Sequence, residues 1–74
     1  MKKEYKFTVV IERDEDRKYV ASCPTLPGCH TEGDTYEEAM ENMRDAVDLA
    51  IASRREVGDP IPEEIGTSAI KIAV

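Results

Sequence analysis

The stretch ASCPTLPGCHTEGDTYEEA, residues 21–39, decides the fold of this chain. It contains the end of an expected strand, a turn, a second short strand and the start of a helix. Pro24 and Pro27 restrict φ while Gly28 is free to adopt a positive φ, so these residues predict a sharp turn. No nucleophile, base and orienting acid are assembled nearby. We therefore interpret the stretch as architectural and expect function to lie on surfaces that it positions.

The residues before this stretch alternate in polarity, as strands do. Residues 5–12 carry an apolar side chain at every second position, and a second alternating run covers residues 18–23. Five consecutive charged residues, 13–17, separate the two runs and predict a solvated hairpin turn. Pro24 ends the second strand because it has no backbone donor. A third, short edge strand is expected at residues 29–32, and Gly33 ends it.

The residues that follow predict one long helix from Tyr36 to about Val57. Thr35 and Glu38 have the spacing of a capping box, in which each side chain satisfies a free backbone donor of the first turn. Gly58 is suited to the C-terminal cap. An apolar stripe with steps of three and four residues sustains the helix over four turns; its members are Tyr36, Ala39, Met40, Met43, Ala46, Val47, Ala50 and Ile51.

Residues 68–74 alternate again and predict a fourth strand, after a connector at residues 58–66. A right-handed crossover through the helix would place this strand parallel to the first. The expected class is α+β, a two-layer β-β-β-α-β fold with sheet order 3-2-1-4 and the helix on one face. We expect residues 1–74 to form one domain, without a C-terminal DNA-binding domain.

The composition favours a protein partner over nucleic acid. The net charge of −6 opposes binding to a phosphate backbone and suits a basic partner. Neither a signal peptide nor a membrane-length apolar run is apparent, so we expect a cytoplasmic protein. So short a chain buries a thin core, and we expect a homo-oligomer, a dimer or a tetramer.

Two groups of residues invite a chemical interpretation. Cys23, Cys29 and His30 cluster, but five residues separate the cysteines and no second pair exists, so core packing is favoured over a zinc or redox site. Acidic residues at 14–16, or Glu32 with Asp34, are suitable ligands for Mg²⁺. They do not come from separate converging elements, as two-metal hydrolysis requires. No catalytic residue, metal or cofactor is therefore predicted.

The combined pattern resembles the HicB-like antitoxin family. The residues that carry the resemblance are Tyr19-x-Ala21, Pro24-x-Leu26-Pro27-Gly28-Cys29-His30-Thr31-x-Gly33-x-Thr35 and Glu38-Ala39-x-x-Asn42. The resemblance implies a partial ribonuclease H-like fold without the nuclease's catalytic acids. It also implies that the motif residues are structural: Pro24, Pro27 and Gly28 shape the turn, and Gly33, Thr35 and Glu38 set the helix start.

The function that the resemblance implies is neutralisation of a small basic RNA-targeting toxin, HicA, by a non-catalytic binding module. Asp14, Glu15 and Asp16 on the first hairpin are the candidate partner-binding residues. Two other interpretations stay open: a degenerate metal-dependent nuclease-like enzyme, and an orphan module for assembly or small-molecule binding.

Overall fold

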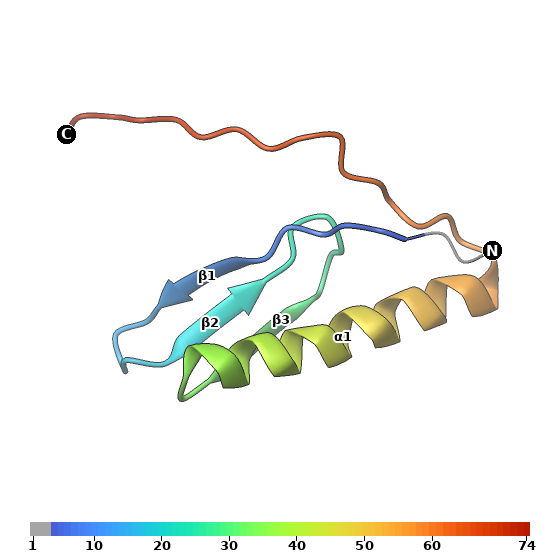
Figure 1. The fold of residues 1–74 in the computed structure, drawn as a ribbon, viewed down its shortest axis with the longest axis horizontal. Coiled ribbons are helices and arrows are strands. Elements are labelled where there is room, and N and C mark those ends of the chain that lie inside the picture. Colours follow the sequence, from blue (N-terminus) through green and yellow to red (C-terminus); the bar gives the residue numbers. More distant parts are fainter. Residues whose placement is uncertain (1–3) are drawn as a thin grey trace.

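The computed structural model describes residues 4–74 and contains three strands followed by one long helix (Figure 1). The strands are β1 (Val10–Arg13), β2 (Tyr19–Ser22) and β3 (His30–Gly33), and the helix is α1 (Tyr36–Val57). The helix packs on one face of the sheet, against β3 and β2. The predicted α+β class is therefore confirmed. Within the described residues, no helix is both long and apolar enough to cross a membrane.

The sheet is an antiparallel meander in the order β1-β2-β3. Ala21, on the central strand, lies opposite Ile11 of β1 and opposite Thr31 of β3. Its side chain is fully buried, because alternate residues of a strand face the same side and this side faces the helix. The core is therefore centred on β2 and the first half of α1.

The buried core is small and includes one residue that the sequence analysis did not place there. Leu26 lies in the middle of the proline turn and is only 1% exposed. The turn folds over it through hydrogen bonds from Leu26 N to Cys23 O and from Cys29 N to Leu26 O. The remaining fully buried apolar residues are Ala21, Cys23, Cys29, Ala39 and Met43. The turn between β2 and β3 is thus part of the core, and Pro24 and Pro27 lie exposed on its outside.

The turn and the helix start have the backbone that their residues predict. Gly28 adopts a φ of 87°, a region that L-residues with a side chain rarely enter. Thr35 caps α1 by accepting a hydrogen bond from Glu38 N at 3.1 Å. Gly33 is buried against the helix, and a Cβ at this position would lie 2.7 Å from Ala39 N. Only glycine therefore allows β3 to approach α1 this closely.

The first predicted strand and one residue of the predicted apolar stripe differ from the structure. The first strand begins at Val10 and not at Tyr5. Continued in the same register, the ladder with β2 would pair Thr8 with Pro24, which has no backbone N–H to donate. Tyr36 was assigned to the apolar stripe but is 52% exposed, since it lies in the first turn of α1, beyond the sheet.

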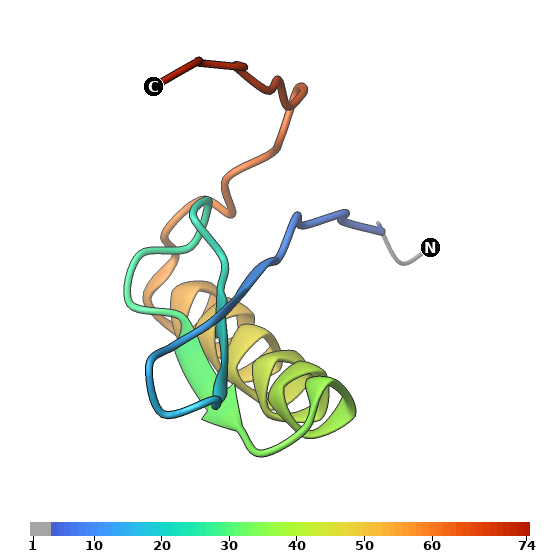
Figure 2. The ribbon, with the colours of Figure 1, turned by 90° about the vertical axis from the view of Figure 1, so that its left-hand side faces the viewer.

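The predicted fourth strand at residues 68–74, and with it position 4 of the sheet order, is wrong for this structure. The chain is extended after α1, and residues 68–74 lie away from the sheet (Figure 2). Ile70, Ile72 and Val74 are 86%, 74% and 120% exposed. Residues 68–74 could form a strand only beside a free strand edge. The chain carries them past the end of β1, where no such edge among residues 4–74 lies next to them.

The path of this segment is set close to residue 64. The carboxylate of Glu64 accepts hydrogen bonds from the backbone N–H and the hydroxyl of Thr8, and the chain then runs in the same direction as β1 (Figure 1). If the two segments advance equally from the Thr8–Glu64 pair, Ala69 lies opposite Arg13, which is the last residue of β1. The alternating apolar residues therefore have no strand beside them.

Candidate partner-binding surface

The first hairpin is held by Asp14, one of the three predicted partner-binding residues. Its Oδ1 accepts hydrogen bonds from Asp16 N and Lys18 N, both at 2.9 Å. Asp14 N donates to Lys18 O, and Arg17 adopts a φ of 63° to close the turn. The Asp14 carboxylate therefore shapes the turn, whereas Glu15 and Asp16 project their exposed side chains from a defined backbone.

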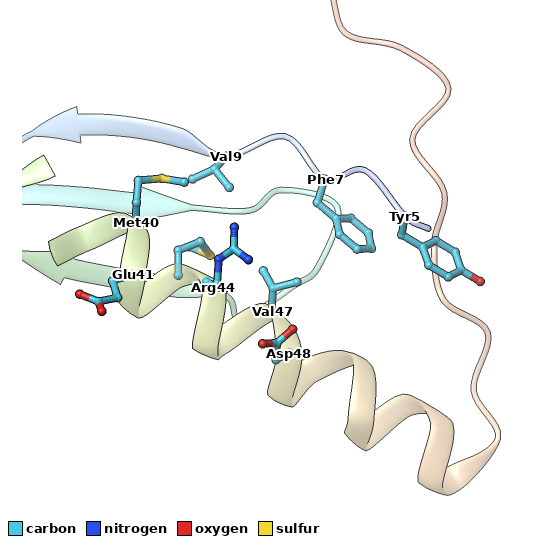
Figure 3. Close-up of a pocket in the computed structure, with 9 residues that line it drawn as sticks. Tyr5, Phe7, Val9, Met40, Glu41, Arg44, Val47 and Asp48 are labelled. Atoms are coloured by element: carbon cyan, nitrogen blue, oxygen red, sulfur yellow. The ribbon is translucent and has the colours of Figure 1, made fainter. Parts of the chain in front are cut away.

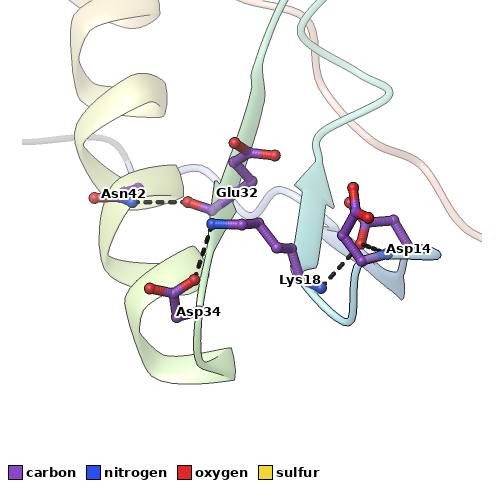
Figure 4. Close-up of polar contacts among 6 residues, drawn as sticks. Asp14, Lys18, Glu32, Asp34 and Asn42 are labelled. Carbon is purple, nitrogen blue, oxygen red and sulfur yellow. Dashed lines mark hydrogen bonds and ion pairs between the residues drawn. The ribbon is translucent and has the colours of Figure 1, made fainter.

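An ion pair connects this hairpin to the start of α1. Lys18 Nζ lies 2.9 Å from Asp34 Oδ1 (Figure 4). The hydrogen bond and charge of Asp34 raise the pKa of Lys18, and the charges of Glu32 and Glu38 raise it further. Both partners of the ion pair are exposed, so its contribution to stability is small. Its geometric consequence is that the hairpin and the helix start lie at the same end of the molecule.

We call this region the acidic end. It consists of the exposed residues Asp14, Glu15, Asp16, Glu32, Asp34, Glu37 and Glu38. These acids outnumber the basic residues among them, Arg13, Arg17 and Lys18, and the Arg13 guanidinium is placed over the Tyr19 ring at 5.2 Å from its centroid. The net negative field at this end attracts a cationic surface and accelerates its approach.

The backbone beneath the acidic end is anchored by side chains of the strand and the helix. Asn42 Nδ2 donates to Glu32 O at 3.0 Å, and Thr31 Oγ1 donates to Ala39 O at 3.1 Å (Figure 4 for Asn42). Both bonds join β3 to α1. The acids at residues 32–38 are thus displayed from a rigid backbone, which lowers the entropic cost of binding a partner there.

The cysteines and the histidine differ in burial. Cys23 and Cys29 are free thiols in the core, 2% and 5% exposed, and Cys29 Sγ donates to Ala46 O at 3.9 Å. Burial raises the pKa of the Cys29 thiol, the neighbouring Cys23 raises it further, and Arg54 opposes the shift. His30 is exposed. Both thiols therefore act as small apolar side chains, and the raised pKa of Cys29 keeps that thiol protonated at neutral pH.

The acidic residues do not converge. Between residues 4 and 74, no three His, Cys, Asp or Glu side chains are grouped so that they could hold a metal ion. The hairpin acids point outward, and the acids after β3 lie beside the Lys18 ammonium.

A second surface, which we call the open groove, lies between residues 5–9 and α1 (Figure 3). Its volume is about 550 Å³. Tyr5 and Phe7 stack along it with ring centroids 6.1 Å apart. The apolar lining is Tyr5, Phe7, Val9, Met40, Met43 and Val47, and the charged lining is Glu41, Arg44 and Asp48. This surface suits a binding partner whose contacting side chains are mostly apolar.

The comparisons with known proteins agree on one class, the antitoxins of bacterial toxin-antitoxin systems. The family model described as HicB-like antitoxin of bacterial toxin-antitoxin system matches residues 7–72. A UPF0150 protein of Synechocystis is 45% identical over 60 residues, 81% of this chain and 76% of the relative. A UPF0150 protein of Archaeoglobus fulgidus is 40% identical over 67 residues, 90% and 94% of the two chains.

A solved structure supports the same class. The crystal structure of the N-terminal domain of the Burkholderia pseudomallei antitoxin HicB superposes with a TM-score of 0.72 at 26% identity, covering 82% of this chain and 72% of that one. This chain belongs to the HicB-like antitoxin family. Its fold is that of the HicB N-terminal domain, and the chain is an antitoxin module.

Neither the open groove nor the anchoring of the acidic end follows from the sequence pattern. The groove results from residues 5–9 and the helix facing each other without a strand between them, which alternation of polarity does not reveal. Asn42 was noted only as part of the family pattern, although an Asn on the exposed side of a helix start can reach a neighbouring strand. The place of Asn42 on the helix was therefore the one sequence feature that could have predicted its bond to β3.

Proposed function

We propose that this chain neutralises a small basic HicA-type toxin that acts on RNA, by binding it and without catalysing a reaction. The observation that carries the proposal is the match of residues 7–72 to the antitoxin family. A binding module of this kind needs a preformed surface whose charge is opposite to that of its partner. The cytoplasm, where a toxin would meet RNA, is the proposed location.

The acidic end is the proposed contact surface for the toxin. Glu15 and Asp16 leave their carboxylates free while Asp14 holds the turn that presents them. The neighbouring acids Asp34, Glu37 and Glu38 extend the same negative surface across to the first turn of α1. A basic toxin surface would approach this end faster, and bind it more tightly, at low ionic strength than at high ionic strength.

The test is coexpression with a small basic protein of the HicA type. If the proposal is correct, the two proteins copurify, and this chain restores growth to cells that express the toxin. The chain with Glu15→Lys and Asp16→Lys should bind the toxin at least about tenfold more weakly, which is a loss of about 1.4 kcal/mol. Absence of both complex formation and growth rescue would contradict the proposal.

A matched control separates local charge from net charge. Glu56→Lys with Asp59→Lys changes the net charge by the same amount at exposed positions on the opposite end of α1. The control variant should keep most of the affinity. If both double variants lose affinity equally, the acidic end is not the contact surface, although the antitoxin function stands. Mg²⁺-dependent RNA cleavage by the purified chain would favour the nuclease-like alternative.

A further inference from the structure

The outer edge of β1 is unpaired. Among the described residues, β2 is the only strand that pairs with β1. Asp14 N donates to Lys18 O, so the N–H of residue 14 points toward β2. Because strand geometry repeats every two residues, the N–H groups of Val10 and Glu12 also point toward β2, and those of Ile11 and Arg13 point to the outer edge. An exposed edge of this kind is a template for another strand.

The open groove continues this edge into an apolar surface. A strand placed beside β1 would present alternate side chains to the groove, between Phe7 and Val9 on the sheet side and Met40 and Val47 on the helix side (Figure 3). The groove is therefore suited to a strand with apolar residues at every second position.

The C-terminal segment, residues 68–74, has this pattern and no surface to cover it. Ile70, Ile72 and Val74 alternate with Ala69, Lys71 and Ala73, and the three large side chains are almost fully exposed. Lys71 is its one charged residue. One molecule thus exposes both a strand with an apolar face and a strand edge with an apolar groove.

The connector prevents the segment from reaching its own groove in register. The backbone after α1 is fixed by bonds from Asp59 N to Arg54 O at 2.9 Å and from Arg54 Nη1 to Pro60 O at 3.3 Å. Pro60 and Pro62 fix their own φ and favour extended conformations at the residues before them, Asp59 and Ile61. The bond between Glu64 and Thr8 then places the segment beyond the end of β1.

We propose that the C-terminal segment of one molecule pairs with the β1 edge of a second copy and fills its open groove, reciprocally, to form a strand-exchanged dimer. A strand from another molecule is not bound by the register that Glu64 imposes on its own chain. Ile70 and Ile72 then lie beside Phe7 and Val9 of the other copy. Exchange of an identical element is a low-cost route to a symmetric dimer.

The expected area is sufficient for a stable dimer. A seven-residue strand is about 23 Å long at ~3.3 Å per residue. Exchange forms this contact twice, and each contact buries a strand and the surface beneath it. The total approaches the roughly 1,200–2,000 Å² that stable protein interfaces bury. This inference goes beyond the proposed function and requires no toxin.

The decisive experiment is cross-linking between two differently tagged forms of the full chain. One form carries Val10→Cys on β1 and the other carries Lys71→Cys on the C-terminal segment. A short bifunctional maleimide reacts with these exposed positions, while native Cys23 and Cys29 are buried. We expect a cross-link between the two forms, and several-fold less when exposed Asp45→Cys on α1 replaces Val10→Cys.

A second pair of variants tests the apolar face directly. Ile72→Asp should weaken the dimer by at least about tenfold in Kd, measured by sedimentation, because the change occurs in both contacts. Ala73→Asp adds the same charge on the opposite side of the strand and should have a smaller effect. Circular dichroism reports whether each variant remains folded.

Three results would overturn the proposal. The first is a monomer whose Val10→Cys, Lys71→Cys double variant cross-links only within one chain, which would mean that the segment returns to its own sheet. The second is a dimer without the cross-link between forms. The third is equal weakening by Ile72→Asp and Ala73→Asp, which would mean that the alternating face does not enter the groove.

Discussion

The two edge strands of this small sheet, β1 and β3, differ in how closely they contact the rest of the molecule. At β3, the backbone approaches the helix so closely that Gly33 has no room for a Cβ, and side chains of Thr31 and Asn42 bond across the boundary. At β1, no strand among residues 4–74 pairs with the outer edge. The same helix thus covers a packed half of the sheet and leaves an open groove beside the other half.

The difference shows how stability and binding are divided in a short chain. Burial of apolar area stabilises the fold, and nearly all fully buried side chains lie near β2, β3 and the first half of α1. On the β1 side, Phe7, Val9 and Ile11 are only partly buried against that core, and residues 68–74 are exposed, so this side has apolar surface available for another chain. Substitutions should therefore have large effects on the β3 side and small effects on the β1 side.

The largest expected effect is from Leu26→Ala. This change removes a side chain that is 1% exposed and leaves a cavity under the proline turn, so the free energy of unfolding should fall by about 3 kcal/mol. Ile65→Ala, on a side chain that is fully exposed, is the matched control and should change it by less than about 0.5 kcal/mol. Urea unfolding followed by circular dichroism measures both. Equal effects would mean that the core is not where the structure places it.

Gly33→Ala should have the next largest effect. The added Cβ would lie 2.7 Å from Ala39 N, which is backbone and cannot move aside, so the strand and the helix must separate. The expected loss is about 2 kcal/mol. At Gly66, an added Cβ meets nothing within 4 Å, so Gly66→Ala should be neutral or slightly stabilising in the same unfolding assay. A neutral Gly33→Ala would show that the two elements are packed more loosely.

Thr35→Ala removes the N-terminal cap of α1. The variant loses the hydroxyl that accepts the 3.1 Å bond from Glu38 N, and the expected loss is about 1 kcal/mol. Ser68→Ala, in the exposed C-terminal segment, removes a hydroxyl without removing a cap. Thermal unfolding should give a lower Tm for Thr35→Ala alone. A Tm for Thr35→Ser close to that of the unchanged chain would assign the effect to the hydroxyl.

The smallest effect is confined to the β1 side and depends on pH. Hydrogen bonds from the Thr8 hydroxyl and backbone N–H lower the pKa of Glu64 below its ordinary value of 4.5. Because the folded pKa is depressed, the contact is complete above pH 4.5 and is lost as the pH falls through the folded pKa. The Thr8 amide resonance should therefore titrate with a midpoint below 4.5. In Glu64→Gln this titration should disappear while global stability hardly changes.

Local patterns in the sequence predicted the packed side of the molecule well. The bounds of α1, its threonine cap, the glycine after it and the proline turn all follow from dihedral preferences and capping chemistry of neighbouring residues. The position of Leu26 was missed, because a lone apolar residue in a turn has no periodicity that would indicate burial. Asp14 was predicted to contact a partner, and its observed bonds to Asp16 N and Lys18 N result from its place at the first position of the turn.

The sequence by itself determined the α+β class, the long amphipathic helix and the antitoxin family, because each depends on residues close together in the chain. Only the tertiary structure decided that residues 68–74 do not pair with the sheet of their own chain. Their alternation specifies a strand, but pairing also requires a free edge in register, and the path from Gly58 to Glu64 decides that. It also decided that the hairpin acids and the helix start form one acidic end, since Lys18 and Asp34 meet only when the sheet has folded.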